Sequence, residues 1–291
     1  MRLIFEKRTL TAILIVAVLA AGIVWFFVLE GRGTPKSQNE PAVFKQEIIG
    51  QSVEGRSIEA YTYGSGAKHL VFVGGIHGGY EWNSVVLAYE FLDYLENTSG
   101  TLPAGLTVTV IPSANPDGVF NVVGKEGRFA AGDVPTSQSV QAAGRFNANK
   151  VDLNRNFDCK WQPKSTWRGA EVSAGTAAFS EPEAKAIRDF ALREKPAGFI
   201  FWHSQANAVY ASECKDGILA GTMTLMNTYA KAAGYPAVDT FDAYEVTGDA
   251  EGWLASIDIP AITVELKTHE TIEWENNLAG VKALFNLYRE P

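Results

Sequence analysis

Residues 69–82 read HLVFVGGIHGGYEW and combine a strand, a glycine-rich junction and the start of a helix. The run 69–73 is short and apolar, which predicts a buried strand, and Gly74 and Gly75 end it. From residue 82 to residue 95 the apolar side chains recur at helical spacing. A strand that leads directly into a helix is the repeating unit of α/β domains.

The chain on either side of this stretch alternates between strands and helices in the same way. Two short runs around a glycine-containing turn predict an opening hairpin over residues 47–61. We further expect strand 106–111, helix 180–193, strand 198–202, helix 222–233, strand 261–266 and helix 272–289. This order predicts an α/β fold, a single domain with a mixed, mostly parallel central sheet flanked by helices.

The N-terminal region differs in composition from the rest of the chain. Residues 10–29 are apolar and uncharged, and about 20 such residues form a helix of about 30 Å, the thickness of the hydrocarbon core. We expect a transmembrane signal anchor at 10–29, a cytoplasmic flank at 1–9, a linker at 30–42 and a folded domain at 43–291. Basic residues before the anchor place that domain on the extracytoplasmic side. A cleaved signal peptide, which would release a secreted protein, is the alternative.

Composition excludes several classes of protein. Hydrophobic residues make up 46% of the 291 residues and aromatic residues 11%, which is too much for a disordered chain. The net charge of −8 argues against a nucleic-acid partner, which needs a basic surface. Two cysteines cannot supply a disulfide scaffold or a four-cysteine zinc site. Because there are only four histidines, any histidine within a motif is informative.

Polar side chains occur where three of the predicted strands end. His77 follows the strand 69–73, His203 follows the strand 198–202, and Glu265 lies late in the strand 261–266. Ligands gather at the carboxyl ends of strands in such sheets. Alternation turns Glu265 away from the apolar side chains of its strand, and a buried carboxylate needs a partner.

Glu81 stands four residues after His77, at the junction between strand and helix. Two histidines and one glutamate with an open fourth position form a catalytic zinc arrangement. The spacing of His77 and Glu81 alone fits a polar surface turn as well, so the rest of the chain must decide.

Several segments, in order along the chain, resemble the zinc metallocarboxypeptidases of the funnelin family (peptidase family M14). The resemblance begins at about residue 45 and continues to the end, which implies a metallocarboxypeptidase-like fold and makes 43–291 the catalytic domain. The matching segments are Ile49–Arg56 (IGQSVEGR), Asn115–Gly118 (NPDG), Val151–Phe157 (VDLNRNF), Phe179–Glu183 (FSEPE), Trp202–Ser204 (WHS), Tyr244–Trp253 and Thr263–Leu266 (TVEL).

The resemblance implies a metal centre and a general base. His77, Glu81 and His203 would bind one zinc ion per chain, and Glu265 would take a proton from zinc-bound water and later return it. One departure concerns the spacing, because three residues separate His77 from Glu81 where the family has two. The two glycines among those three residues can absorb the extra length.

The resemblance also implies a site for the substrate's terminal carboxylate. Asn154 and Arg155 would clamp that carboxylate, a task suited to the planar guanidinium group, and Tyr244 would close over it on a mobile loop. An arginine upstream of this pair would stabilise the oxyanion of the transition state. We expect Arg145 in this role, with Arg128 as the second choice.

The C-terminal part of the domain suggests the substrate's side chain. No lysine or arginine occurs between residues 232 and 266, where acidic residues are frequent. Glu251 matches the family position that helps to set the side-chain pocket, and an acid there implies a basic C-terminal residue or the amino group of diaminopimelate. An acidic solvated surface explains the same residues equally well.

Four further residues receive an interpretation. Cys159 and Cys214 follow segments that should border the cleft, so a disulfide between them is plausible in an oxidising compartment, and free buried thiols are the alternative. His69 and His269 are interpreted as structural.

These inferences lead to a predicted function. The chain would be a membrane-tethered zinc metallocarboxypeptidase that hydrolyses the C-terminal peptide bond of peptides with a free carboxylate. Its partners would be the peptide substrate and, through the N-terminal helix, the membrane. A zinc amidase or deacylase of the same fold, acting on murein peptides or acylated amino acids, is one alternative. A non-catalytic binding protein is the other.

Overall fold

The computed structural model describes residues 44–289, apart from residues 99 and 243. The predicted flank at 1–9, anchor at 10–29 and linker at 30–42 therefore lie outside the described residues. Among the residues that are described, no helix combines the length and apolar character needed to cross a membrane.

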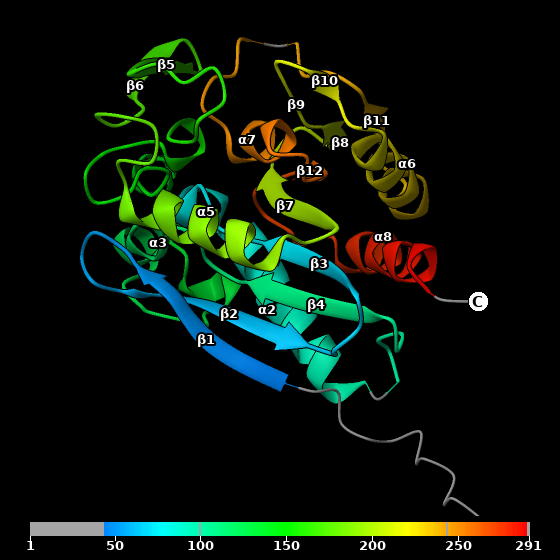
Figure 1. Cartoon of the computed structure of the whole chain (residues 1–291). Coiled ribbons are helices and arrows are strands. Elements are labelled where there is room, and N and C mark those ends of the chain that lie inside the picture. The colour runs from blue at the N-terminus through cyan, green and yellow to red at the C-terminus, as the bar shows by residue number, and fades with distance from the viewer. Residues whose placement is uncertain (1–43, 99, 243, 290–291) are drawn as a thin grey trace, which may run out of the picture. The chain divides into compact units, whose positions relative to one another are not determined.

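The centre of the described chain is an eight-stranded mixed sheet (Figure 1). Its strand order is β1-β2-β4-β3-β7-β12-β8-β11, and two short hairpins, β5-β6 and β9-β10, stand outside it. The strands are β1 (Phe44–Gln51), β2 (Ser57–Tyr63), β3 (Lys68–Val73), β4 (Leu106–Ile111), β5 (Lys164–Trp167), β6 (Ala170–Ser173), β7 (Gly198–Ser204), β8 (Ala208–Ala211), β9 (Glu213–Cys214), β10 (Gly217–Ile218), β11 (Ala237–Val238) and β12 (Ala261–Leu266).

The strands that carry the predicted site lie together in the parallel middle of the sheet. Three consecutive strand pairs in the middle of the sheet are parallel: β4-β3, β3-β7 and β7-β12. The pairs β1-β2 and β2-β4 on one side and β12-β8 on the other are antiparallel. Because β3, β7 and β12 run in the same direction, their carboxyl ends meet at one edge of the sheet, where ligands bind in α/β folds.

Helices cover both faces of this sheet (Figure 1). On one face α2, α6 and α8 pack on side chains such as Phe72, Ile200 and Val264. On the other face α5 and α7 pack on Val71, Phe199 and their neighbours. The helices are α2 (Trp82–Asn97), α3 (Pro116–Val123), α4 (Gln138–Ala143), α5 (Pro182–Glu194), α6 (Ala220–Ala233), α7 (Ala250–Ser256) and α8 (Trp274–Leu287), with short 3-10 turns η1 (Gly78–Glu81), η2 (Ala131–Asp133) and η3 (Leu153–Arg155).

The predicted α/β architecture with a mixed sheet is confirmed, and the main differences concern short elements. The expected helix 272–289 is shorter at both ends. The NPDG segment is the start of α3, because the Asn115 side chain accepts a hydrogen bond from Gly118 N and Pro116 takes the first helical position. The sequence patterns missed β8, α7 and the two strands of the β5-β6 hairpin, and none of these elements is longer than seven residues.

Candidate metal centre and substrate cavity

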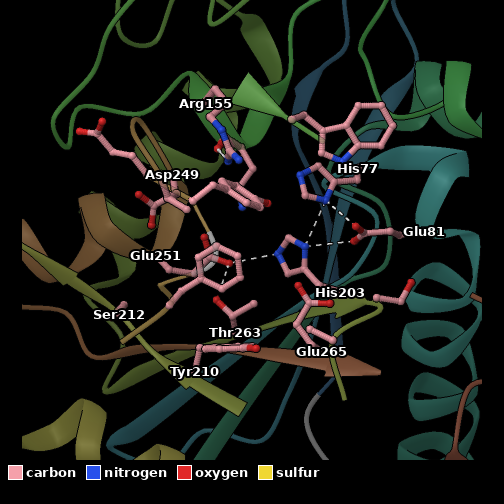
Figure 2. Close-up of a pocket in the computed structure, with 18 of the residues that line it drawn as sticks. His77, Glu81, Arg155, His203, Tyr210, Ser212, Asp249, Glu251, Thr263 and Glu265 are labelled. Carbon is pink, nitrogen blue, oxygen red and sulfur yellow. Dashed lines mark hydrogen bonds and ion pairs between the residues drawn. The ribbon is translucent and has the colours of Figure 1, made fainter. Parts of the chain in front are cut away.

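The predicted residues converge at the carboxyl ends of β3, β7 and β12 (Figure 2). His203 lies near the end of β7, and Glu265 is its direct partner in the parallel register of β12. His77 and Glu81 stand on the loop and the 3-10 turn η1 that connect β3 to α2. Alternation along β12 sends Val264 into the core and leaves Glu265 facing the cavity, as predicted.

His77, Glu81 and His203 form a buried group with metal-ligand geometry. The two Glu81 oxygens approach one imidazole each, at 2.8 Å from His77 Nδ1 and 3.0 Å from His203 Nδ1. The two Nδ1 atoms are only 3.2 Å apart. One proton between the two imidazole nitrogens forms a single hydrogen bond, in which one nitrogen donates and the other accepts. A metal cation at this point could instead be bound by both nitrogens and by the carboxylate. Two histidines and one glutamate are ligands typical of catalytic zinc, so the residues present fit this ion.

Close backbone packing explains how the longer His77-to-Glu81 spacing is accommodated. Gly78 has a φ of 48°, and a Cβ added there would lie 2.4 Å from the Gly144 carbonyl oxygen. A Cβ on Gly118 would meet the same oxygen at 2.4 Å. Glycine at these positions lets the loop pack directly on α3, and Glu81 still reaches His77 across the additional residue.

The electrostatics of the metal-free group favour a charged carboxylate and a charged imidazole. Burial alone would raise the pKa of Glu81, but the adjacent His77 and His203 imidazoles lower this pKa far below its usual range. Burial alone would lower the pKa of His203, whereas the Glu81 and Glu251 carboxylates raise it well above its usual value. The site is therefore arranged to stabilise positive charge next to Glu81, which is what a bound cation supplies.

Each histidine also faces a second buried carboxylate through its other ring nitrogen. His77 Nε2 lies 3.5 Å from Asp152 Oδ1, and His203 Nε2 lies 3.1 Å from Glu251 Oε1. The exposed fraction is 0% for Asp152 and 2% for Glu251. Carboxylates in this position orient metal-binding imidazoles.

Glu265 has the environment of a group that exchanges protons. Burial raises its pKa to about 8, and the negative charge of Glu81 acts in the same direction. Its Oε2 atom is buried without a hydrogen-bond partner among the described residues. A carboxyl group with a pKa near neutrality, beside a metal group and with a free oxygen, is suited to general acid–base catalysis.

The structure distinguishes the two arginines that the sequence offered for the oxyanion. Arg145 is 3% exposed, donates from Nε to Asp152 Oδ2 at 2.8 Å and has Nη1 3.8 Å from Glu81 Oε1. Its guanidinium group stacks on the Trp167 ring at 4.6 Å. Arg128 instead forms an exposed ion pair with Asp93 and does not line the cavity.

Asn154 and Arg155 are neighbours on η3 and both line the cavity, and Figure 2 shows Arg155 on the far side of His203 from Glu265. Asn154 Oδ1 accepts a hydrogen bond of 2.8 Å from Ala250 N, which ties η3 to the start of α7. Arg155 donates from Nη1 to the Asn154 carbonyl oxygen at 2.6 Å, and its Nε is buried without a partner among the described residues. A buried guanidinium group with an unused donor is available for an anionic ligand.

Tyr244 stands on the segment between β11 and α7 with 39% of its surface exposed. Its ring packs on Phe241 at 4.8 Å and lies 5.9 Å from the Arg155 guanidinium carbon. The segment is held at Gly248, which has a φ of 70° and exchanges backbone hydrogen bonds with the chain just after Arg155. The predicted carboxylate clamp and the predicted covering tyrosine thus border one cavity.

The cavity has a volume of about 480 Å³ and carries both signs of charge on its wall. Its acidic lining residues outside the metal group and the base are Glu213, Glu245, Asp249 and Glu251, and its basic ones are Arg145, Arg155, Lys160 and Arg168. Burial and the nearby Glu251 charge raise the pKa of Asp249 to about 6. The acidic C-terminal stretch therefore does contribute to the cavity, as well as to the surface.

Cys159 and Cys214 form a disulfide, with Cα atoms 6.0 Å apart. Of the two interpretations left open by the sequence, the bonded one is correct. The bond connects the segment that follows Arg155 to the short strand β9, and both segments line the cavity.

Some functional neighbours were not singled out from the sequence. Asp152 stands two residues before Asn154 within a segment that was recognised, so its place beside His77 could have been inferred from the motif. Trp167 gave no such signal, because it comes from the unpredicted β5-β6 hairpin. His269, interpreted as structural, lies beside the site with Nδ1 2.6 Å from Ser204 Oγ, whereas His69 bonds Thr109 on the neighbouring strand β4.

The fold and the buried His77-Glu81-His203 group are those expected of the metallocarboxypeptidase class. The chain belongs to the zinc carboxypeptidase family, whose sequence pattern it matches over residues 36–279. Zinc is the metal of that family, and the His77-Glu81-His203 group is arranged to bind a metal.

Three known proteins illustrate the range of relatives. The chain is 26% identical over 238 residues to gamma-D-glutamyl-L-diamino acid endopeptidase 1 of Lysinibacillus sphaericus, with 75% of this chain and 59% of that protein covered. It is 29% identical over 300 residues to carboxypeptidase B of Helicoverpa zea, with 82% and 65% covered. The chain thus spans less than two thirds of the length of either protein. In fold it resembles the murein-tripeptide amidase of Escherichia coli O157, with a TM-score of 0.59, 23% identity, and 88% and 97% of the two chains covered.

Proposed function

We propose that this protein is a zinc-dependent metallocarboxypeptidase that removes the C-terminal residue of peptides. The observation that carries the proposal is the shared cavity of the metal group, Glu265 and the Asn154-Arg155 pair. The unused, buried donor of Arg155 favours a substrate with a carboxylate at this depth. A substrate held there by its free C-terminus would present its last peptide bond to the metal group.

The residues of the chain divide the reaction between them. Bound zinc would lower the pKa of a coordinated water to about 7 and polarise the scissile carbonyl. Glu265 would accept a proton during attack and return it to the leaving amine, a role suited to a carboxyl group beside the metal group whose Oε2 is buried without a hydrogen-bond partner among the described residues. Arg145 would donate to the developing oxyanion, since its guanidinium group is fixed by Asp152 and Trp167.

A C-terminal residue with an amino group in its side chain fits the acidic part of the cavity. Asp249 and Glu251 line the same cavity as Arg155, and the charge of Arg155 acts on Asp249. One relative is named for L-diamino acids and another is a carboxypeptidase B. We therefore propose lysine, arginine and diaminopimelate as the C-terminal residues of the substrate. Glu251, as predicted from the sequence, and Asp249 would be the acidic contacts of their amino or guanidinium groups.

The second candidate is an amidase or endopeptidase that acts on murein peptides. Similarity to a gamma-D-glutamyl-L-diamino acid endopeptidase and to a murein-tripeptide amidase favours it. In that case the scissile bond would join the gamma carboxyl of D-glutamate to the diamino acid. The same metal group and Glu265 would perform the hydrolysis.

The predicted location completes the proposal. The apolar run at 10–29 would anchor the enzyme in the membrane with its catalytic domain on the extracytoplasmic side. Cleavage of this run would instead give a secreted enzyme. Mass determination of the N-terminus of the protein recovered from the membrane fraction and from the medium decides between the two.

The test compares substrates that differ in one feature. The full chain, loaded with zinc, is incubated with peptides that end in lysine, phenylalanine or diaminopimelate, and with the same peptides carrying a C-terminal amide. We expect release of the last residue from the free lysine and diaminopimelate peptides and at least tenfold slower reaction with the amides. Cleavage of gamma-D-glutamyl-diaminopimelate alone would favour the second candidate. Binding of the peptides without cleavage of any of them would contradict both.

A further inference from the structure

We infer that Glu251 is a positioning residue for the metal centre, which holds the His203 imidazole in the orientation that binds the ion. The inference rests on the proposed zinc centre and gives Glu251 a task beyond the predicted contact with the substrate's side chain. Glu251 is 2% exposed, and its Oε1 atom lies 3.1 Å from His203 Nε2 (Figure 2).

The two nitrogens of His203 face different groups. Nδ1 points toward Glu81 and His77, where the metal would bind, and Nε2 points toward Glu251. When Nε2 carries the hydrogen that bonds Glu251, the lone pair of Nδ1 is directed at the metal. A carboxylate at Nε2 therefore fixes both the tautomer and the ring orientation of His203.

The carboxylate of Glu251 is itself held in place from two sides. Thr263 Oγ1 on β12 donates to the same Oε1 atom at 3.1 Å. The first turn of α7 is fixed by Ala250 N, which donates to Asn154 Oδ1, and by the Asp249 side chain, which accepts from Gly252 N. The Glu251 carboxylate is thus fixed in position, and rotation of the His203 ring would break its hydrogen bond to Glu251.

At the ring nitrogen that faces away from the metal group, Nε2, His203 has a closer carboxylate partner than His77 has. His77 Nε2 is 3.5 Å from Asp152, and Asp152 also accepts a hydrogen bond from Arg145. Glu251 has no cationic partner within 4 Å other than His203 among the described residues. Its negative charge is therefore directed to His203, and Asp249 remains as the neighbouring acid for a substrate's amino group.

The experiment measures metal binding and does not depend on turnover. Zinc affinity of the full chain is determined by competition with a chromophoric chelator for wild type, Glu251→Ala, Glu251→Gln, Thr263→Val and Asp249→Asn. We expect Glu251→Ala to weaken zinc binding by about 10- to 100-fold. Gln can still accept a hydrogen bond from Nε2, so Glu251→Gln should weaken binding less. Thr263→Val should also cause a smaller loss, because the carboxylate keeps its charge but loses an anchor.

Asp249→Asn is the matched control, since it removes a neighbouring charge from the same cavity and asparagine is an equally good N-cap. It should leave zinc affinity within twofold of wild type. The visible absorption of the cobalt-substituted protein should change for Glu251→Ala and stay unchanged for Asp249→Asn. Circular dichroism of the metal-free variants checks folding. If Glu251→Ala does not fold, the loss of zinc affinity in Glu251→Gln and Thr263→Val, compared with Asp249→Asn, decides.

Two results would overturn the inference. One is a zinc affinity of Glu251→Ala, or of Glu251→Gln and Thr263→Val together, within twofold of wild type. The other is an equal loss in Asp249→Asn, since the effect would then be that of any negative charge in the cavity. Failure of the zinc-loaded wild type to cleave peptides would count against the proposed function and would leave these affinities interpretable.

Discussion

Glu265 and His203 are paired in the parallel register of β12 and β7, so backbone hydrogen bonds set the distance between the proposed general base and a proposed metal ligand. The same register pairs Val264 with Trp202, both of which are buried in the core. A slip of one residue would turn Glu265 into the core and Val264 into the cavity. Packing of the apolar side chains therefore positions the catalytic ones.

Replacement of Glu265 by glutamine tests the base. Glutamine has nearly the same shape but cannot accept and return a proton, so kcat/KM for a lysine-terminated peptide should fall by about 10²- to 10⁴-fold. Zinc content, measured by atomic emission, should stay at one ion per chain because the predicted ligands are intact. Wild-type turnover by the zinc-loaded variant would exclude Glu265 from the mechanism.

Arg145 and Arg128 form a natural pair for testing oxyanion stabilisation. Arg145→Ala should lower kcat by about 10²- to 10³-fold, because the donor is buried beside the metal group and preorganised by Asp152 and Trp167. Arg128→Ala removes an exposed ion pair with Asp93 and contacts with Tyr89, all outside the cavity lining, and should leave kcat unchanged. A reversed order of the two effects would show that the structure places the wrong arginine at the site.

The glycine contact behind the metal loop predicts a difference between two Gly→Ala variants. Gly124 and Gly78 both have positive φ, but a Cβ on Gly124 meets nothing within 4 Å and one on Gly78 meets the Gly144 carbonyl oxygen. Gly124→Ala should lower the free energy of unfolding by about 1 kcal/mol. Gly78→Ala should lower it by about 2–4 kcal/mol and also weaken zinc binding. Denaturant unfolding and chelator competition measure the two effects, and equal losses for both variants would refute the packing argument.

The pKa of Glu265 predicts how stability of the metal-free protein varies with pH. In the folded state the carboxyl group keeps its proton up to about pH 8, whereas in the unfolded chain it releases it near its ordinary value of 4.5. Between these values the folded state binds more protons, so the free energy of unfolding should fall as pH rises from about 5 to 8. Glu265→Gln cannot titrate and should show a flatter profile in urea unfolding. Parallel profiles for the two proteins would mean that Glu265 ionises normally in the fold.

Long periodic segments of the sequence predicted most of the sheet and the larger helices. The strands 106–111 and 261–266 have the expected bounds because burial on one or both faces leaves a strong apolar pattern. α7, with seven residues, and the β5 and β6 strands, with four residues each, were missed because such short elements do not show a period. Their positions depend on tertiary contacts, such as Trp167 packing on Arg145.

The residues of the metal group could be predicted from the sequence, whereas the contact between His203 and Glu251 could not. His77, Glu81 and His203 stand at strand ends, and the resemblance of several segments to the family, rather than the local spacing, selected them. The bond between His203 and Glu251 joins β7 to α7, two elements 48 residues apart at these positions, and no local pattern encodes it. Such a contact can be identified only when the register of the sheet and the position of α7 are both known.

The disulfide between Cys159 and Cys214 has a consequence for how the enzyme matures. It links the segment that follows Arg155, the proposed carboxylate-binding arginine, to β9 at the wall of the cavity, and it closes a loop across 55 positions of sequence. Thiols stay reduced in most cytosolic compartments and are oxidised outside them. A newly made chain would thus carry an unfinished substrate wall until it met an oxidant, which would delay peptide hydrolysis until after export.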